Sequence, residues 1–591
     1  MRRSFALGGS AVIALMLVIT AWLAVLPNLA VSGLRDRVQL QLSRRLEVKG
    51  GAHLSFAPLA FTLNQVSLAL PEGMEGRFIT AEKLRIPVGL AQLFGGTPVF
   101  TTLTLEGADI ALLVDERDRV SWDFGGSAPA TPLTFHLASS AIRYYDARNG
   151  QALAIGDVNG GISIGSDGLV SFTGSTDLNG RLARFDMTLK SLARVSSDGS
   201  PFTLSFATPE ITANFDGRLS VAKVLNLDGP VDIAITNLRQ AARWAGLAIE
   251  DGTSSGAVSI AGALGSSGRA FAIRQANVGL DQANVYGEIA IDTRHAVPKL
   301  QARLTTPNFT LDNFLPPSGA SDGAWGRLPL GFAVLKQFDA EITLETPDLR
   351  YGPLDNQPAR LVATVAGGKF QASVALQPAD GAIMSADVAI DASAVVPVFS
   401  ANVKTESADA RLLLSTLLGQ DWLSGRGSLA ANLSGSGQTQ EEIIGSLKGK
   451  ATLSLSNGAI AGLDVAAGLG QVSFRILDGW PGDQASRTEF TSLTADVTVA
   501  DGIATIGNLK LDGKGLALTA TGEIDLLRRA ADLSADPRLI GADGSSAGLP
   551  VKIVVNGPWA APRIHPDVEG LPGDPQKGFA ALKSMGVKSG N

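Results

Sequence analysis

The feature that most constrains the fold is a two-residue alternation of apolar and polar side chains, which recurs over most of the chain. Between residues 514 and 526, every second residue from Leu516 to Leu526 is apolar or small, and the residues between them are mostly polar. A period of two places the two sets on opposite faces of a β-strand. We therefore expect a mainly β protein: an elongated, repetitive antiparallel sheet that is curved into an apolar groove, with few short helices.

Turn sequences separate the alternating segments. Asn-Gly and Asp-Gly pairs, which favour tight hairpin turns, stand at residues 159–160, 167–168, 179–180, 457–458 and 501–502. Spacings of roughly 8 to 12 residues between turn signals are typical of antiparallel meanders. A charged cluster at residues 115–119 indicates one exposed hairpin tip, and we assign it no chemistry.

The chain begins with a candidate membrane anchor. Arg2 and Arg3 precede an apolar run, Phe5 to Leu26, which as a helix is long enough to cross a hydrocarbon core of about 30 Å. A cleaved signal peptide is the alternative, but its apolar region is usually about 7 to 15 residues long. We expect one N-terminal transmembrane helix within residues 1–33, with the arginines in the cytoplasm and the following chain on the outer side of that membrane.

Few other segments have a helical pattern. Residues 34–46 predict a short amphipathic helix close to lipid head groups, because this stretch carries four arginines, Arg35, Arg37, Arg44 and Arg45. Further helices are expected at residues 238–248, 409–423, 439–447 and 580–587. We interpret them as plugs or caps that cover the sheet where it would otherwise expose an end.

Glycine-, serine- and proline-rich joints divide the sequence into regions. We expect five of them: a cytoplasmic stub and anchor at residues 1–33, an N-terminal β region at 34–130, a middle β-sheet region with short helices at 131–425, a C-terminal β region at 426–562, and a flexible tail with a short helix at 563–591.

Composition and spacing argue against several kinds of chemistry. The chain has no cysteine, a net charge of −7 and no basic block, so disulfides and thiolate sites are excluded and nucleic acid is not an expected partner. The four histidines, His53, His136, His295 and His565, lie far apart and lack metal-ligand spacing. Gly-x-Ser-x-Gly occurs around Ser163, Ser254 and Ser546, but without the strand–turn–helix context of a nucleophile elbow. We expect no enzyme activity, no metal and no cofactor.

Two regions resemble a known family. The first combines the basic segment after the anchor with Phe61–Leu68, Ile79–Ile86, Leu103–Ile110 and Ser121–Phe124. The second contains Gly445–Ser454, Asn457–Asp464, Thr488–Leu493, Gly522–Leu526 and Gly557–Pro562. This order of segments resembles the AsmA-like family of Gram-negative envelope proteins, a family related to AsmA and TamB. The middle of the chain is similar to the family mainly in its alternating strand pattern.

The resemblance implies a single-pass inner-membrane protein whose β-rich body lies in the periplasm. Relatives are associated with outer-membrane assembly and phospholipid homeostasis, and similar long proteins are viewed as bridges that shield lipid tails in a groove. The implied partners are the inner membrane and phospholipid. The alternative is a scaffold that regulates the targeting or insertion of outer-membrane proteins without transporting lipid.

A one-sided apolar sheet suits such a cargo. Exposing a 16-carbon acyl chain to water costs on the order of 12 kcal/mol, at about 0.8 kcal/mol per methylene, and a continuous apolar face lowers that cost at every point along a path. A closed β-sandwich requires the same alternation, so both arrangements stay open here. The candidate groove residues are Leu361, Val365, Phe370, Val374, Leu376, Leu516, Leu518, Ala520, Ile524, Leu526, Val551, Ile553 and Val555.

Overall fold

A computed structural model shows how the alternating segments pair. It describes residues 31–36, 38–39, 43–56, 59–89, 101–124, 132–246, 256–280, 283–313, 325–376, 383–418, 421–462, 464–465, 486–540, 546–548, 552–558 and 562–567. Most of the expected anchor and the expected tail helix lie outside these residues. Within the described ranges, no helix combines the length and the apolar character needed to cross a bilayer.

Contacts divide the chain into two compact units, which we describe one at a time. The first unit contains Met1–Ala245, Ser255–Asp281 and Ala290–Arg294, and the second contains Gly246–Ser254, Gln282–Ile289 and His295–Asn591. The five regions expected from the sequence stay a prediction.

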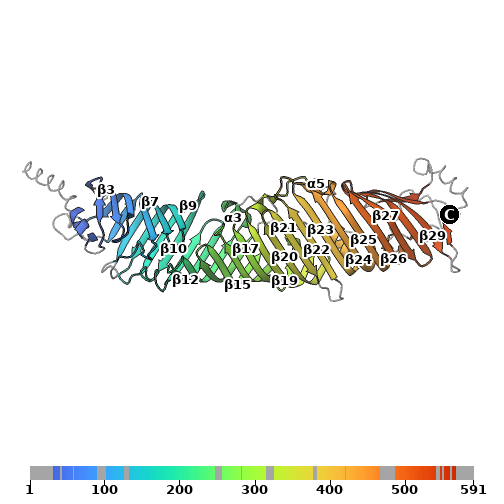
Figure 1. Cartoon of the computed structure of the whole chain (residues 1–591), viewed down its shortest axis with the longest axis horizontal. Coiled ribbons are helices and arrows are strands. Elements are labelled where there is room, and N and C mark those ends of the chain that lie inside the picture. The colour runs from blue at the N-terminus through green and yellow to red at the C-terminus, as the bar shows by residue number, and fades with distance from the viewer. Residues whose placement is uncertain are drawn as a thin grey trace, which may run out of the picture. The chain divides into compact units, whose positions relative to one another are not determined.

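The described part of the first unit is a mostly antiparallel sheet (Figure 1), with helical residues 31–36 and 38–39 before its first strand and a short helix, α3 (Leu238–Trp244), further on. From β7 to β15, successive strands pair antiparallel, whereas β5 and β6 pair with β7 in parallel. Its elements are β1 (Leu46–Val48), β2 (Ala52–Phe56), β3 (Leu59–Ala69), β4 (Arg77–Pro87), β5 (Thr102–Glu106), β6 (Asp109–Val114), β7 (Leu133–Asp146), β8 (Gln151–Ile164), β9 (Val170–Leu178), β10 (Arg181–Leu189), β11 (Ser200–Ala207), β12 (Ile211–Ser220), β13 (Asn226–Ile235), α3 (Leu238–Trp244), β14 (Val258–Ser267) and β15 (Ala270–Leu280).

The hydrophobic core of the first unit gathers around β3 to β8. It includes Leu63, Ile86, Val114 and Val158, which are almost completely buried. Residues 31–36 and 38–39 are helical and place Val31 and Leu34 in the same core. The expected helix at residues 34–46 is therefore correct only in its first part, because the chain leaves the helix before residue 43 and enters β1 at Leu46.

The second unit is also a mostly antiparallel sheet, with β17 and β18 parallel to β19 and an antiparallel run from β19 to β29. It contains most of β16 (Ala283–Asp292), then β17 (Lys299–Thr305), β18 (Phe309–Thr310), η1 (Leu311–Asn313), η2 (Phe332–Lys336), β19 (Asp339–Tyr351), β20 (Leu354–Ala366), β21 (Lys369–Leu376), β22 (Ile383–Asp391), β23 (Val398–Asp409), α4 (Ala410–Leu418), β24 (Leu423–Ser436), α5 (Gln440–Gly445), β25 (Lys448–Ala461), β26 (Arg487–Ala500), β27 (Ile503–Gly513), β28 (Leu516–Asp525), β29 (Ala530–Ile540), β30 (Ser546–Gly548), β31 (Ile553–Pro558) and β32 (Arg563–Pro566).

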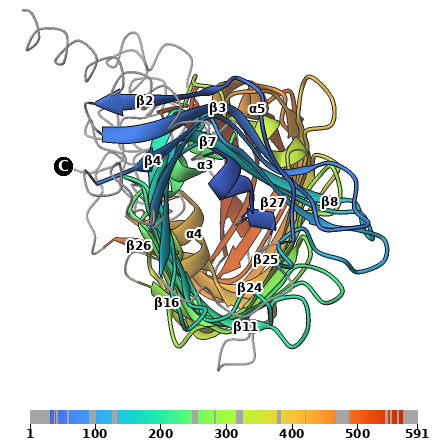
Figure 2. The same cartoon turned by 90° about the vertical axis from the view of Figure 1, so that its left-hand side faces the viewer.

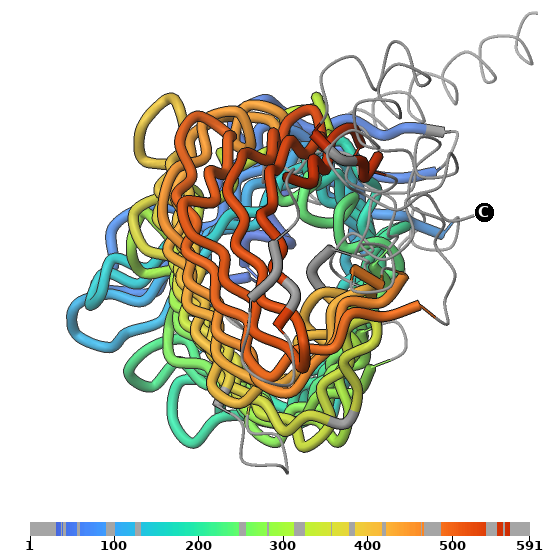
Figure 3. Tube along the Cα trace, turned by 90° about the vertical axis from the view of Figure 1, so that its right-hand side faces the viewer, coloured from blue at the N-terminus to red at the C-terminus, as the bar shows by residue number. Residues whose placement is uncertain are grey.

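The strands of the second unit are strongly curved. Figure 2 shows α4 on the concave side of this sheet, and Figure 3 shows the curvature of the orange and red strands at the C-terminal end. The mainly β class, the largely antiparallel pairing and the small number of short helices are thus confirmed for the described residues. The parallel pairs of β5, β6, β17 and β18 depart from the purely antiparallel sheet that we expected.

Three expected helices are present, each shorter than its sequence pattern. α3 begins after Asn237, whose side chain accepts a hydrogen bond from the Gln240 backbone. α4 begins after Asp409, whose Oδ1 accepts from the Arg411 amide at 2.9 Å. α5 begins after Thr439, whose hydroxyl accepts from the Glu442 amide at 3.2 Å. In each case a side-chain oxygen satisfies a backbone donor at the helix start, which is the capping chemistry expected at residues 409 and 439.

Two of the Asn-Gly pairs do not form turns. Residues 167–168, 179–180 and 501–502 lie at hairpin turns as expected, but residues 159–160 lie within β8 and residues 457–458 within β25. Asn457 has a φ of 50°, as does Asp157 at the irregularity in β8. A β-bulge and a hairpin turn both use left-handed backbone conformations, so the dipeptide alone does not distinguish them.

Candidate functional site

The candidate groove residues fall into two groups, both in the second unit. The first group lies on β20 and β21: Leu361, Val365, Phe370, Val374 and Leu376. The second lies on β28, on the turn after it and on β31: Leu516, Leu518, Ala520, Ile524, Leu526, Ile553 and Val555. Val551 lies outside the described residues.

Strand register places the first group in apolar rows that cross several strands. Directly paired residues of antiparallel strands lie on the same face of a sheet. One row runs from β20 to β25: Leu361, Val374, Ala386, Val403, Ala431 and Ala451. A second row on the same face runs from β20 to β23: Val365, Phe370, Ile390 and Phe399. The sequence pattern identified members of these rows strand by strand, and the register joins them into one surface.

The exposure of these rows distinguishes the two faces of the sheet. On β21, the side chains of Phe370 and Val374 are half-buried, whereas Gln371 and Ser373 between them are exposed. The same alternation of half-buried and exposed positions continues along β23, β24 and β25. Two packed sheets would bury their inner side chains fully. Half-burial of the apolar side chains therefore fits a single-layer face better than the interior of a sandwich.

The second group is packed more tightly because α4 shares its face. Ala410 and Leu414 of α4 belong to one apolar cluster with Leu516, Ala520 and Ile553, all three of them buried. Leu518 packs against this cluster and is only half-buried. Since α4 lies on the concave side of the sheet (Figure 2), the apolar face is the concave one. The helix thus covers part of the face around the second group.

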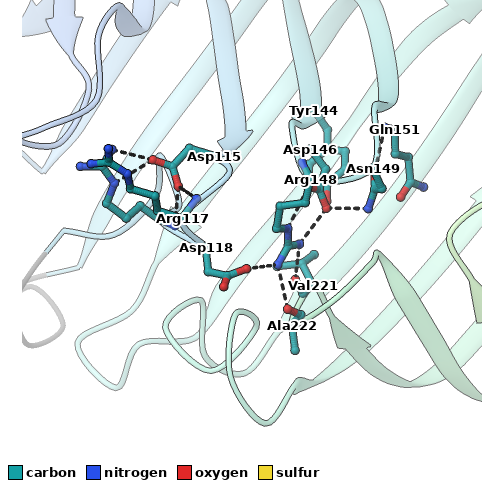
Figure 4. A network of polar contacts seen from close by, with 11 residues as sticks. Asp115, Arg117, Asp118, Tyr144, Asp146, Arg148, Asn149, Gln151, Val221 and Ala222 are labelled. Atoms are coloured by element: carbon teal, nitrogen blue, oxygen red, sulfur yellow. Dashed lines mark hydrogen bonds and ion pairs between the residues drawn. The ribbon is translucent and has the colours of Figure 1, made fainter.

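A buried polar network holds three segments of the first unit together (Figure 4). The fully buried Asp146 accepts hydrogen bonds from Nε and Nη2 of Arg148 at 2.9 and 2.7 Å. Arg148 Nη1 also donates to Asp118 at 2.7 Å, and its Nη2 donates to the Val221 carbonyl at 2.8 Å. The network therefore ties the hairpin tip at residues 115–119 and the segment after β12 to the β7–β8 turn.

The charges in this network stabilise one another. Burial by itself would raise the pKa of Asp146, but its hydrogen bonds to Arg148 and the positive charge of that residue bring the pKa below its ordinary value. Burial, with the negative charge of Asp146 added, raises the pKa of Tyr144 to about 12. Asp118, Asp146 and Arg148 all have charged partners within the network, so we interpret it as a structural brace.

Arg44 is a second buried cation of the first unit, and our expectation that it contacts lipid head groups is wrong. It is only 2% exposed, and its Nη2 donates to the carbonyls of Ser121 and Asp123 at 2.7 and 2.6 Å. Its guanidinium carbon lies 4.9 and 4.4 Å from the ring centroids of Phe78 and Phe124. Burial lowers the pKa of Arg44 to about 10, partly offset by Asp123, so the group stays charged at neutral pH.

The described residues supply little of what an active site needs. Among them, no group of three or more His, Asp and Glu side chains could hold a metal ion. Ser163 lies within β8 with its hydroxyl 3.2 Å from that of Thr134, and Ser546 begins β30. Ser254 lies outside the described residues. Neither described serine therefore has the strand–turn–helix setting of a nucleophile elbow.

Comparison with known proteins finds a family model that matches part of the chain. Residues 357–509 match the model of the AsmA family, a span that contains the first group of candidate residues and the C-terminal resemblance as far as β27. "Protein AsmA" of Escherichia coli (strain K12) is 21% identical over 294 residues, which are 44% of this chain and 47% of that protein. The chain therefore spans about half the length of this relative. No solved structure matches the chain.

Proposed function

We propose, from the premise that the chain belongs to the AsmA family, that it is an envelope protein whose concave apolar sheet face carries the acyl chains of phospholipids. The proposed location is the bacterial inner membrane, with a single N-terminal anchor and the bulk of the chain in the periplasm. The proposal needs no catalytic step, no metal and no cofactor.

The observation that carries this proposal is the half-buried state of all six residues in the apolar row from Leu361 of β20 to Ala451 of β25. Six directly paired residues, one on each of six consecutive strands, make an apolar path of about 24 Å at the usual strand spacing of about 4.8 Å. An acyl chain on this path covers methylenes that would each cost about 0.8 kcal/mol in water. The side chains also gain from being covered, because they are not fully buried by their neighbours.

Site-specific crosslinking tests the proposal directly. A photoreactive amino acid is placed at Val374 or Leu518, both half-buried on the apolar face, in the full chain reconstituted with a phospholipid that carries an alkyne on its acyl chain. The matched controls are Gln371 and Thr519, which are exposed on the opposite face of the same strands. We expect labelled lipid at the inner positions only.

The same experiment separates the alternative function. If no inner position captures lipid while cells still need the protein for a normal envelope, the transport proposal is wrong. A scaffold that regulates insertion of outer-membrane proteins would then be the better account, and substitutions on the inner face would act only through stability.

A further inference from the structure

One segment of the second unit runs across the ends of its strands. Residues 325–338 precede β19 in sequence, yet they contact turns that belong to β20 through β29. We call this segment the strap. Its contacts follow the strands in reverse order, from the β28–β29 turn at Trp325 to the β20–β21 turn, where the Gly367 amide donates to Asp339 just after the strap at 3.0 Å.

One end of the strap is anchored by an aromatic ring. Trp325 Nε1 donates to the carbonyl of Leu526, directly after β28, at 3.0 Å. The guanidinium of Arg529 lies over the indole ring, with its carbon 4.3 Å from the ring centroid. A cation over a tryptophan face is among the stronger contacts of this kind, so Trp325 fixes this end to the β28–β29 turn.

The other end is anchored by a second aromatic ring. Phe332 begins η2 and meets Phe399 of β23 edge to face, with ring centroids 5.0 Å apart. Phe399 belongs to the apolar row that continues through Ile390 to Phe370. Phe332 therefore covers the margin of the proposed acyl-chain path. Lys336 completes this anchor by donating to the Ser393 carbonyl at 3.2 Å.

Between the anchors the strap is exposed and is held by polar contacts. All residues from Gly326 to Leu330 are exposed, Leu328 to 82%. The Gly326 amide donates to Gln440 at 3.0 Å, and Arg327 pairs with Glu441 at 2.6 Å with 82% of the arginine side chain exposed. Two backbone hydrogen bonds add to these contacts: the Glu441 amide donates to the Gly326 carbonyl at 3.2 Å, and the Leu330 amide donates to the Gln438 carbonyl at 3.0 Å. Exposed ion pairs contribute little, and segments with few buried contacts open at low free energy.

We propose that the strap is a closure over one margin of the concave face, and that its opening admits and releases acyl chains. This inference rests on the proposed function. Closed, the strap ties the ends of β23, α5 and the β28–β29 turn at fixed spacings, which fixes the curvature of the sheet and keeps Phe332 over Phe399. Open, it frees that margin and lets the strand ends separate. The two aromatic anchors define the closed position, and the exposed middle keeps opening inexpensive.

A reversible disulfide tests this role, because the chain has no cysteine of its own. A Cβ built at Gly326 would lie 3.7 Å from Cγ of Gln440, which is the place that the sulfur of a cysteine at residue 440 would take in the same rotamer, so the two cysteines would lie close together. Gly326→Cys with Gln440→Cys in the full chain would lock the strap under oxidation and release it under reduction. The probe is phosphatidylethanolamine with a pyrene-labelled acyl chain, and the readout is its loading rate from vesicles.

The oxidised pair should load the probe about tenfold more slowly than the reduced pair, as expected when a covering segment must open first. The single variants Gly326→Cys and Gln440→Cys should show no redox dependence, and Phe332→Ala should load faster than the unmodified chain. Equal rates in the two redox states, or unchanged loading by Phe332→Ala, would overturn the strap role. Failure of the unmodified chain to load the probe would instead overturn the proposed function.

Discussion

At the residue scale, the buried carboxylate of Asp146 offers a test of the polar network by a substitution that changes a single side-chain atom. Replacing Asp146 with Asn keeps its size but leaves the Arg148 guanidinium, only 14% exposed, without its buried counter-charge. Breaking one partner of a buried pair typically costs 3–5 kcal/mol, and we expect about 3 kcal/mol here. The measurement is hydrogen exchange of the β7–β8 turn and of the segment after β12, which should both lose protection.

Asp118 provides the matched control. It accepts from the same arginine at 2.7 Å, but its side chain is 74% exposed. Exposed ion pairs are worth about 0–1 kcal/mol, so Asp118→Asn should change protection little. Equal effects of the two substitutions would mean that burial of Asp146 does not matter, contrary to the brace that we describe.

The lowered pKa of Asp146 gives this prediction a pH dependence. A carboxyl whose pKa is lower in the folded than in the unfolded state contributes its full stabilisation above the unfolded value of about 3.9. That contribution is lost as pH falls through the lower, folded value. The difference in protection between the unmodified chain and Asp146→Asn should therefore be constant from pH 5 to 7 and shrink below about pH 4.

Arg44 shows what a local pattern could not predict at this scale. Four arginines after an apolar run look like a basic surface, and nothing in residues 34–46 marks one of them as different. Its partners, Phe78, Ser121, Asp123 and Phe124, come from segments far away in sequence. Only the folded sheet brings two aromatic faces and two carbonyls together around one guanidinium.

At the scale of elements, Gly458 tests how closely β25 approaches its neighbours. A Cβ added there would lie 2.0 Å from the Ser424 carbonyl oxygen and 2.4 Å from Cζ of Phe490. Because one contact is backbone, the strand itself must shift, and overpacking of this kind costs about 1–3 kcal/mol. We expect Gly458→Ala to destabilise the second unit by about 2 kcal/mol or more in urea denaturation.

Gly507 is the control for that substitution, since it lies in β27 of the same unit and a Cβ there would meet nothing within 4 Å. Gly507→Ala should stay within about 0.5 kcal/mol of the unmodified chain. Adding Phe490→Leu to Gly458→Ala should recover part of the loss, because it removes the ring contact but not the backbone contact. A Gly458→Ala variant as stable as Gly507→Ala would contradict the close approach.

Elements were predictable to the extent that their signal was local. Alternation along β21 and β28 identified strands and inner faces, and Asp409 and Thr439 marked helix starts. The parallel pairing of β5 and β6 with β7 was not predictable, because alternation does not specify which strand lies alongside. The turn predicted at residues 457–458 was wrong for a different reason, because the Asn-Gly dipeptide is compatible with both a hairpin turn and a β-bulge.

The candidate site, too, was predictable only where its residues follow a local sequence pattern. Leu361, Phe370 and Val374 could be assigned to one face from the sequence, and the structure places them in two rows of the same face. The strap could not be found in this way, because Trp325 and Phe332 sit in a segment without periodicity. Their partners, Leu526, Arg529 and Phe399, are between about 70 and 200 residues away along the chain.

At the scale of the whole molecule, the proposed function implies that an acyl chain moves along the apolar path in successive steps. This predicts how the lipid-transfer rate responds to single and double substitutions in the path. Val374→Asp or Val403→Asp would place a hydrated carboxylate in the row that crosses β20 to β25. Each removes contact with about two methylenes, so each should slow lipid transfer by about tenfold. Gln371→Asp, on the exposed face of β21, should leave transfer unchanged.

The double variant separates a path from a set of independent contacts. Barriers met one after another in a path limit the rate by the highest one, so Val374→Asp with Val403→Asp should be at most about twofold slower than either single variant. Independent contributions to one bound state would instead multiply, giving about a hundredfold loss. The measurement is the transfer of a fluorescent phospholipid between donor and acceptor vesicles by the unmodified chain, the two single variants, the double variant and Gln371→Asp. Hydrogen exchange on β21 to β23 checks that the sheet stays folded. A multiplicative loss would mean that Val374 and Val403 hold one chain at a fixed site, and that the face stores lipid instead of conducting it.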